Sequence, residues 1–269
     1  MAIATPTIMP GAEPFFQRGG SVGCLCLHGF TASPAEVRWL AQHLAVQGLS
    51  VYAPRLPGHG SDPRHLARCT WQDWYTATLD GYHLLRAQCE RVVVVGHSMG
   101  GMLALLLAAH VPLDAAAVLA SPAFFPPRMV WMAQAYQYMR PFTDQRDDSP
   151  LNDTVRAEQA ARGEPVIGRV RYDLWSSRAV VQLFQLADVL RQVLPQVTLP
   201  LLLVYSEQDQ TVSLESMRLI AANVASQQVE QCILRRSGHI VTQDVECQQV
   251  FAEVAGFVAR MTAPQPYAP

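Results

Sequence analysis

Ser98, in the segment Gly96-His-Ser-Met-Gly100, has the sequence context of an activated nucleophile. It lies between the valine run Val92–Val95 and the apolar segment Met99–Ala109, which is rich in good helix formers. A buried strand followed at once by a helix puts Ser98 in a sharp turn with a strained backbone, where glycines on either side avoid a steric clash. The first N–H groups of such a helix are unpaired, so the amide of Met99 can bind a developing oxyanion.

A serine hydroxyl is a weak nucleophile at neutral pH, so it requires a histidine to accept its proton and an acid to orient that histidine. In an open α/β sheet, such groups lie beyond the carboxyl ends of the strands. Asp209 follows the predicted strand Leu201–Tyr205, and His239 follows the predicted strand Val229–Leu234. Taken singly, Asp209 is also typical of a turn that starts a helix, and His239 of a solvated loop. Their coincidence with Ser98 at equivalent strand ends predicts a catalytic triad of Ser98, Asp209 and His239.

The loop after the first core strand, Val22–Leu27, is expected to supply a second oxyanion donor, the backbone N–H of Phe30. In this interpretation His28 and Gly29 shape the loop, whereas the alternative is an ordinary His-Gly turn. His97 adjoins Ser98 in the sequence, so its side chain is expected to point away from the site and to support packing.

Alternating strands and helices are expected to hold these residues in place. Besides the elements named above, the pattern predicts a hairpin of Pro14–Gln17 with Val22–Leu27, a helix begun by a capping box at Ser33–Glu36, a strand at Ser50–Ala53, a helix from Thr70 to about Arg86, a strand at Ala115–Ala120, and two late helices. This alternation predicts an α/β fold with a mostly parallel central sheet, helices on both of its faces and right-handed crossovers.

The alternation breaks between Ser121 and Pro200, where aromatic residues accumulate among polar and proline-containing segments. Residues 1–120 and 200–269 are therefore expected to form the core, with residues 121–199 inserted after the sixth strand as a lid or cap. The proline-rich tail, residues 262–269, is expected to fray. The insertion predicts an apolar acyl pocket under the lid, the alternative being that its aromatic side chains only pack the lid.

Length and composition set further bounds. A chain of 269 residues that is 50% apolar can bury one large core, so a single catalytic domain is expected. A formal charge of -2 argues against a nucleic-acid partner. Neither an export signal nor a membrane span is visible, so a cytoplasmic location is expected, with a monomer favoured. The six cysteines form no C-x-x-C pair and are interpreted as buried thiols, so neither a metal nor another cofactor is expected.

The chain resembles α/β-hydrolases of the bacterial carboxylesterase and monoacylglycerol lipase group. The motifs that carry the resemblance span nearly the whole chain: Pro14-Phe-Phe, Leu27-His-Gly-Phe-Thr31, Pro54-Arg-Leu-Pro-Gly-His-Gly60, Asp73-Trp74, Gly96-His-Ser-Met-Gly-Gly101, Glu207-Gln-Asp209 and Ser237-Gly-His-Ile-Val-Thr-Gln-Asp244. The order Ser98, Asp209, His239 is also that of the α/β-hydrolases. The resemblance implies the same triad and the same oxyanion amides, those of Phe30 and Met99.

These observations predict a serine hydrolase that cleaves short-to-medium acyl esters or monoacylglycerols through an acyl-enzyme on Ser98. Two alternatives stay open from the sequence. The same triad serves thioester, lactone or acyl-transfer chemistry in other enzymes, and an inactive member of the fold can act as a binding module.

Overall fold

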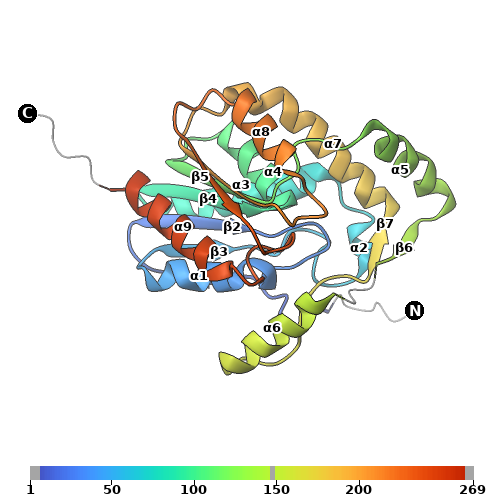
Figure 1. The fold of residues 1–269 in the computed structure, drawn as a ribbon, viewed down its shortest axis with the longest axis horizontal. Helices are drawn as coiled ribbons and strands as arrows, with labels where there is room; N and C mark the ends of the chain where they lie inside the picture. The colour runs from blue at the N-terminus through green and yellow to red at the C-terminus, as the bar shows by residue number, and fades with distance from the viewer. Residues whose placement is uncertain (1–6, 146–148, 264–269) are drawn as a thin grey trace, which may run out of the picture.

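Seven strands form the central sheet in the part of the chain that the computed structural model describes, residues 7–145 and 149–263 (Figure 1). These strands are β1 (Phe15–Gln17), β2 (Val22–Leu27), β3 (Ser50–Ala53), β4 (Arg91–His97), β5 (Ala115–Leu119), β8 (Leu201–Ser206) and β9 (Val229–Leu234). Their order across the sheet is β1-β3-β2-β4-β5-β8-β9, and all neighbours are parallel except β1 and β3. The expected α/β fold with a mostly parallel sheet is confirmed.

The predicted hairpin between β1 and β2 is wrong. β1 pairs antiparallel with β3, so that Phe16 lies opposite Tyr52. The backbone of β2 is already hydrogen-bonded on both sides, to β3 and to β4, which leaves the outer edge of β3 as the place where β1 can pair.

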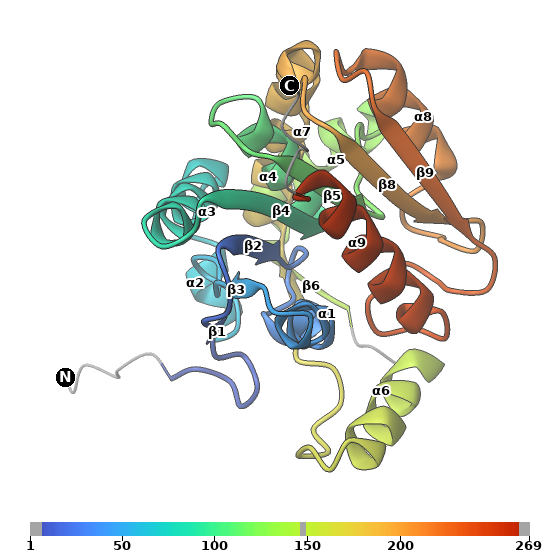
Figure 2. The same ribbon diagram turned by 90° about the vertical axis from the view of Figure 1, so that its left-hand side faces the viewer.

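Helices cover both faces of the sheet, and Figure 2 shows α1 and α9 on one face with α3, α4 and α7 on the other. The helices of the core are α1 (Ala35–Val46), α2 (Pro63–Leu66), α3 (Trp71–Arg86), α4 (Met99–Ala108), α7 (Ser177–Val193), α8 (Leu214–Asn223) and α9 (Cys247–Met261). Successive side chains of β4 enter opposite cores: Val92 and Val94 pack toward α3 and α4, whereas Val93 and Val95 pack toward α1 and α9. Because both of their faces are buried, the central strands β2, β4, β5 and β8 read as nearly continuous apolar runs.

The segment between β5 and β8 contains α5 (Pro127–Met139), β6 (Phe142–Asp144), α6 (Pro150–Ala161), β7 (Leu174–Ser176), α7 and the 3₁₀ turn η1 (Leu194–Gln196). β6 and β7 form a separate antiparallel pair. In Figure 1, α5, β6 and β7 gather beyond one end of the sheet, and α6 projects from the body of the molecule. α7 differs from the rest of the segment, because Leu186 and Leu190 are fully buried in the core formed with α4.

Several smaller expectations can be compared with the structure. The segment follows β5, the fifth strand of the described chain, and not a sixth strand, because the N-terminal region contributes only β1 and β2 before β3. Cys24, Cys26 and Cys89 are buried thiols as expected, but Cys69, Cys232 and Cys247 are partly exposed. The expected frayed tail falls outside the described residues beyond Ala263. None of the helices described has the length and apolarity required to cross a bilayer.

Candidate active site

The turn between β4 and α4 holds Ser98 with a φ of 53°, a conformation that costs a non-glycine residue about 1–3 kcal/mol. Its surroundings enforce this geometry. The N–H of Ser98 donates to the carbonyl oxygen of Leu119 at 2.8 Å, and the N–H of Gly101 donates to the carbonyl oxygen of Ser98 at 2.9 Å. A Cβ atom at Gly96 would overlap the carbonyl oxygen of Gly100, so the glycine spacing has the steric reason that the sequence suggested.

Ser98, His239 and Asp209 form one chain of hydrogen bonds. The Nε2 atom of His239 lies 3.0 Å from the Oγ of Ser98, and its Nδ1 lies 2.8 Å from the Oδ2 of Asp209. A carboxylate can only accept, so Nδ1 carries the proton and Nε2 is free to accept the hydroxyl proton of Ser98. Each residue follows the carboxyl end of a different strand, β4, β8 or β9. The fold thus brings His239 to Ser98, 141 residues away in the chain, and to Asp209, 30 residues away.

Both oxygens of the Asp209 carboxylate accept hydrogen bonds, which stabilise its ionised form. Burial raises its pKa, but the hydrogen bond from His239 and those from the backbone outweigh burial, so the net pKa lies below the ordinary value. Its Oδ1 accepts the N–H groups of Thr211 at 2.7 Å and Val212 at 2.9 Å, which leaves Oδ2 for His239. The carboxylate therefore has a fixed orientation and a negative charge to present to the imidazole.

The loop that carries His239 is fixed by two acidic side chains of the same loop. The Oε2 of Glu246 accepts the N–H and the hydroxyl of Ser237, at 2.7 and 2.8 Å, and the Oδ2 of Asp244 accepts the N–H of Gly238 at 2.6 Å. Ser237 and Asp244 lie within the Ser237–Asp244 motif, but Glu246 lies outside every motif recognised in the sequence. These bonds fix the backbone just before His239.

Of the two predicted oxyanion donors, Phe30 lines the same cavity as Ser98, and Met99 directly follows Ser98 in the chain. Phe30 is in the loop after β2, and Met99 is the first residue of α4. Within the described residues, the N–H of neither has a protein acceptor, whereas the N–H of the adjacent Gly29 is bonded to Glu36. Their backbone donors are therefore free for a ligand.

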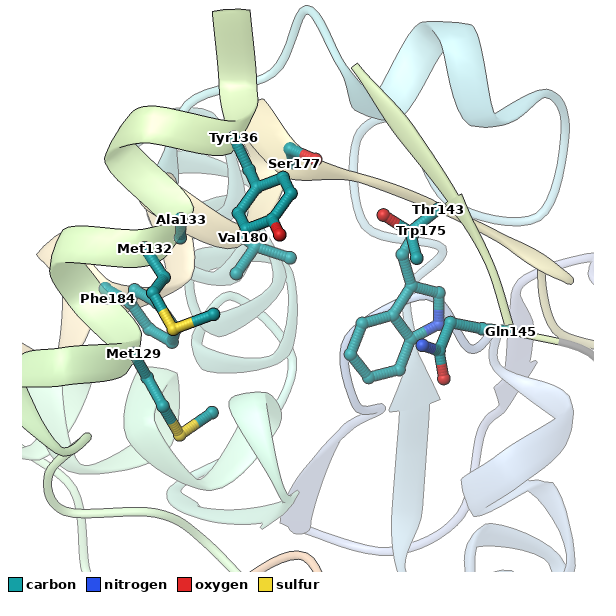
Figure 3. Close-up of a pocket in the computed structure, with 10 residues that line it drawn as sticks. All are labelled: Met129, Met132, Ala133, Tyr136, Thr143, Gln145, Trp175, Ser177, Val180 and Phe184. Carbon is teal, nitrogen blue, oxygen red and sulfur yellow. The ribbon is translucent and has the colours of Figure 1, made fainter. Parts of the chain in front are cut away.

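Ser98 and His239 line a cavity of about 970 Å³. Its apolar wall comes from the segment between β5 and β8 and includes Phe124, Phe125, Met129, Trp175, Leu183 and Phe184. The rings of Phe125 and Phe184 lie 4.4 Å apart, centroid to centroid. A second cavity of about 350 Å³ shares Met129, Trp175, Val180 and Phe184 with the first, and Figure 3 shows Met129 and Phe184 on one side of it, facing Trp175 on the other. Four aromatic residues of the insertion, Phe124, Phe125, Trp175 and Phe184, therefore line space next to the nucleophile, whereas Trp131 and Tyr138 are exposed.

Three polar residues near the site were misinterpreted from the sequence. Ser33 does not cap α1, because its hydroxyl donates to the carbonyl oxygen of Val170. The Oε1 of Glu36 instead accepts the N–H of Gly29 at 2.7 Å and lies 2.9 Å from the Nδ1 of His97. His97 is fully buried but makes polar contacts at both ring nitrogens, so it is more than packing support. Glu36 lies in the first turn of a predicted helix, a position that gave no signal of its contacts with Gly29 and His97.

His28 and His59 lie buried beneath the loop that carries Phe30, with their ring centroids 5.0 Å apart. The Nε2 of His28 accepts the N–H of Leu56, so this ring is neutral. Burial lowers the pKa of His28 from 6.5 to about 4 and that of His59 well below 6.5.

These histidines predict acid destabilisation. In the unfolded chain they bind protons near pH 6.5, but in the folded protein His28 binds one only near pH 4. Their pH-dependent contribution to the free energy of unfolding is complete above pH 6.5 and is lost as pH falls. His28 alone accounts for a loss of about 3 kcal/mol. Urea unfolding at successive pH values measures this loss. The window from 6.5 to about 5.5 isolates it, because carboxylates such as Glu36, whose ordinary pKa is 4.5, take up protons in the unfolded chain mainly below that range. A free energy of unfolding that stays constant across that window would contradict the prediction.

Comparison with known proteins shows similarity along nearly the whole chain. Residues 24–254 match the model of the alpha/beta hydrolase family. The chain is 30% identical over 260 residues to a thermostable monoacylglycerol lipase of Bacillus sp. (strain H-257), covering 94% of this chain and 96% of that protein. It is 26% identical over 262 residues to a carboxylesterase of Bacillus subtilis (strain 168), covering 97% and 99%. A solved structure from work on the metagenome-derived lipolytic enzymes LipS and LipT has a TM-score of 0.83 at 24% identity, covering 94% of this chain and 100% of that one.

Proposed function

Since this chain belongs to the alpha/beta hydrolase family and is an enzyme of the carboxylesterase and monoacylglycerol lipase kind, we propose that it hydrolyses esters through an acyl-enzyme on Ser98. The observation that carries the proposal is the hydrogen-bond chain from Ser98 through His239 to Asp209. A nucleophile, a base and an orienting acid at these distances are what acyl transfer by serine requires.

In the first half of the reaction, the Nε2 of His239 takes the proton of Ser98 as the Oγ attacks the ester carbonyl carbon. The carbonyl oxygen becomes negatively charged, and the free N–H groups of Phe30 and Met99 stabilise it. The tetrahedral intermediate then collapses: the bond to the alcohol oxygen breaks, and His239 gives its proton to that oxygen. An acyl group remains on Ser98, and Asp209 stabilises the imidazolium while it exists.

In the second half, His239 removes a proton from a water molecule, whose oxygen attacks the acyl carbon. The bond to Oγ breaks, Ser98 regains its proton from His239, and the carboxylic acid leaves. Each half returns the imidazole to its starting tautomer, with Nδ1–H bonded to Asp209.

The substrate is proposed to be a short-to-medium acyl ester or a monoacylglycerol. The support is the wall of aromatic and aliphatic side chains beside Ser98, which favours an uncharged acyl chain over a charged one. The segment from α5 to β7, which supplies Met129 and Trp175 to that wall, is proposed to act as the lid of the site. The names of the relatives, a monoacylglycerol lipase and a carboxylesterase, agree with this class.

A panel of matched acyl compounds tests the proposal. We expect esters to be hydrolysed faster than thioesters or amides of the same acyl group, with free acid released to water. Across p-nitrophenyl esters and monoglycerides from acetate to palmitate, kcat/KM should peak at an intermediate length, because each buried methylene adds about 0.8 kcal/mol until the cavity is full. Preferred transfer to an alcohol or cleavage of thioesters would favour the alternative chemistries, and a flat length profile would contradict the acyl pocket.

A further inference from the structure

Glu36 and His97 form a second carboxylate–histidine pair, directly beneath the catalytic residues. The Nδ1 of His97 lies 2.9 Å from the Oε1 of Glu36, and its Nε2 lies 2.9 Å from the carbonyl oxygen of His239. Both facing oxygens can only accept hydrogen bonds, so both ring nitrogens must carry a proton. His97 is therefore an imidazolium paired with a carboxylate, and both side chains are buried.

The charges around the pair agree with this assignment. Burial lowers the pKa of His97, but the Glu36 carboxylate outweighs burial and raises it above the ordinary value. Burial raises the pKa of Glu36, yet His97 and the more distant Arg169 bring it down to about 2. The other ionisable groups that face His97 are Asp209 after β8 and the imidazoles of His28 after β2 and His239 after β9, the ring of His239 being 5.1 Å away.

The pair connects the loops that form the catalytic site. Oε1 of Glu36 accepts the N–H of Gly29, next to Phe30, and His97 is the residue before Ser98. Through its Nε2–H, His97 holds the backbone of His239, the catalytic base. The hydroxyl of Thr242, in the same loop as His239, donates to the carbonyl oxygen of Glu36 at 2.6 Å. The loop after β2, the turn after β4 and the loop after β9 are thus joined through Glu36 and His97.

We propose that the Glu36–His97 ion pair positions the backbone of His239 and the Phe30 loop relative to Ser98. This inference rests on the proposed function, because it assigns a role in aligning the base and the oxyanion donor of that reaction. Neither Glu36 nor His97 exchanges a proton with the substrate. A misplacement of about 1 Å in such an arrangement costs about 10²-fold in rate, so a bond that fixes the base contributes directly to turnover.

Glu36→Gln tests the charge of the pair while keeping its shape. The glutamine oxygen takes the place of Oε1, where it still accepts the N–H of Gly29 and faces Nδ1 of His97. A neutral His97 protonated on Nδ1 then has no proton on Nε2 for the His239 carbonyl oxygen, and no lone charge is left buried. We expect kcat to fall by about tenfold at neutral pH, with KM changed by less than about twofold. Because Glu36 no longer raises the pKa of His97 while burial still lowers it, we expect that residue to be neutral at neutral pH.

The pH profile separates positioning from a merely structural role. In the wild type, His97 loses a proton as pH rises through its raised pKa, and one of its two hydrogen bonds then fails. The wild-type kcat divided by the kcat of Glu36→Gln should therefore be largest at neutral pH and smaller in alkaline solution. A constant ratio would indicate a structural defect and overturn the inference, as would an unchanged kcat.

Two further variants complete the experiment. Glu230→Gln removes the carboxylate of a surface ion pair with Arg260 and is the matched control, expected to keep wild-type activity. His97→Gln removes the positive charge and offers a single amide in place of a ring that bonds both Glu36 and the His239 carbonyl oxygen. It should show the same loss, with no additional loss when combined with Glu36→Gln. Additive losses would contradict a shared role.

A fluorophosphonate probe distinguishes the two levels of the proposal. Rapid labelling of Ser98 in the wild type supports the proposed function independently of Glu36. If Ser98 is labelled and Glu36→Gln leaves kcat and its pH profile unchanged, the positioning role alone is wrong. If Ser98 is not labelled, the function itself is wrong.

Discussion

Replacing Ser98 by alanine is expected to lower kcat/KM for p-nitrophenyl butyrate by at least about 10⁴-fold, the scale on which serine hydrolases lose activity when the nucleophile is removed. The variant removes the Oγ that lies 3.0 Å from Nε2 of His239, so no acyl-enzyme can form. Alanine keeps the Cβ and therefore the same strained φ of 53°, so the melting temperature should stay within about 2 °C. Steady-state hydrolysis and a thermal melt measure the two effects.

Ser226→Ala is the matched control for this prediction. Ser226 is partly exposed between α8 and β9, and its hydroxyl donates to the carbonyl oxygen of Gln228 and accepts the N–H of the same residue, so its loss should leave activity unchanged. A fluorophosphonate should add its mass to the wild type and to Ser226→Ala but not to Ser98→Ala. Hydrolysis by Ser98→Ala at a rate comparable to the wild type would overturn the assignment of the nucleophile.

Asp209→Asn is expected to lower kcat by about 10⁴-fold while leaving the fold intact. The single oxygen of the asparagine should keep the backbone bonds to Thr211 and Val212, which turns its NH₂ group toward Nδ1 of His239. A donor at this place forces the proton of the imidazole onto Nε2. His239 is then unable to accept the proton of Ser98, although every heavy atom stays near its original position.

Kinetics with the matched variant Asp188→Asn provide the comparison. Asp188 is exposed on α7 and forms an ion pair with Arg191 at the surface, so the Asp188→Asn enzyme should have wild-type activity. Near-normal turnover by Asp209→Asn would show that another acid orients His239. A loss of folding in circular dichroism would instead reveal a structural role for Asp209, and the kinetic prediction would then be wrong in its stated form.

The local parts of the site were predictable because their signals lie within a few neighbouring residues. Four valines, a glycine-flanked serine and an apolar helix specify a strand, a sharp turn and a helix, and the structure has β4, Ser98 and α4 in those places. Asp209 and His239 could be predicted because parallel strands present their carboxyl ends at one edge of the sheet. That rule converts positions in the sequence into a common location without knowledge of any contact.

Other features depend on contacts between distant residues and gave no local signal. The pairing of β1 with β3 depends on β2 being already paired on both sides. Glu36 resembles the last residue of a capping box in sequence, but its carboxylate turns to Gly29 and to His97, which is 61 residues away. His97 in turn bonds the carbonyl oxygen of a residue 142 positions away. Helix propensity and side-chain alternation contain no information on such partners.

By itself, the sequence determined the order of most strands and helices of the core and the residues that could carry acyl-transfer chemistry, because hydrophobic periodicity and turn geometry act over short distances. The tertiary structure decided which side chains meet. It set the 3.0 Å contact between Ser98 and His239, the shape of the cavity lined by α5, β7 and α7, and the ion pair beneath the site. The physical reason is that hydrogen bonds and packing act between atoms in space, and only the folded chain brings those atoms together.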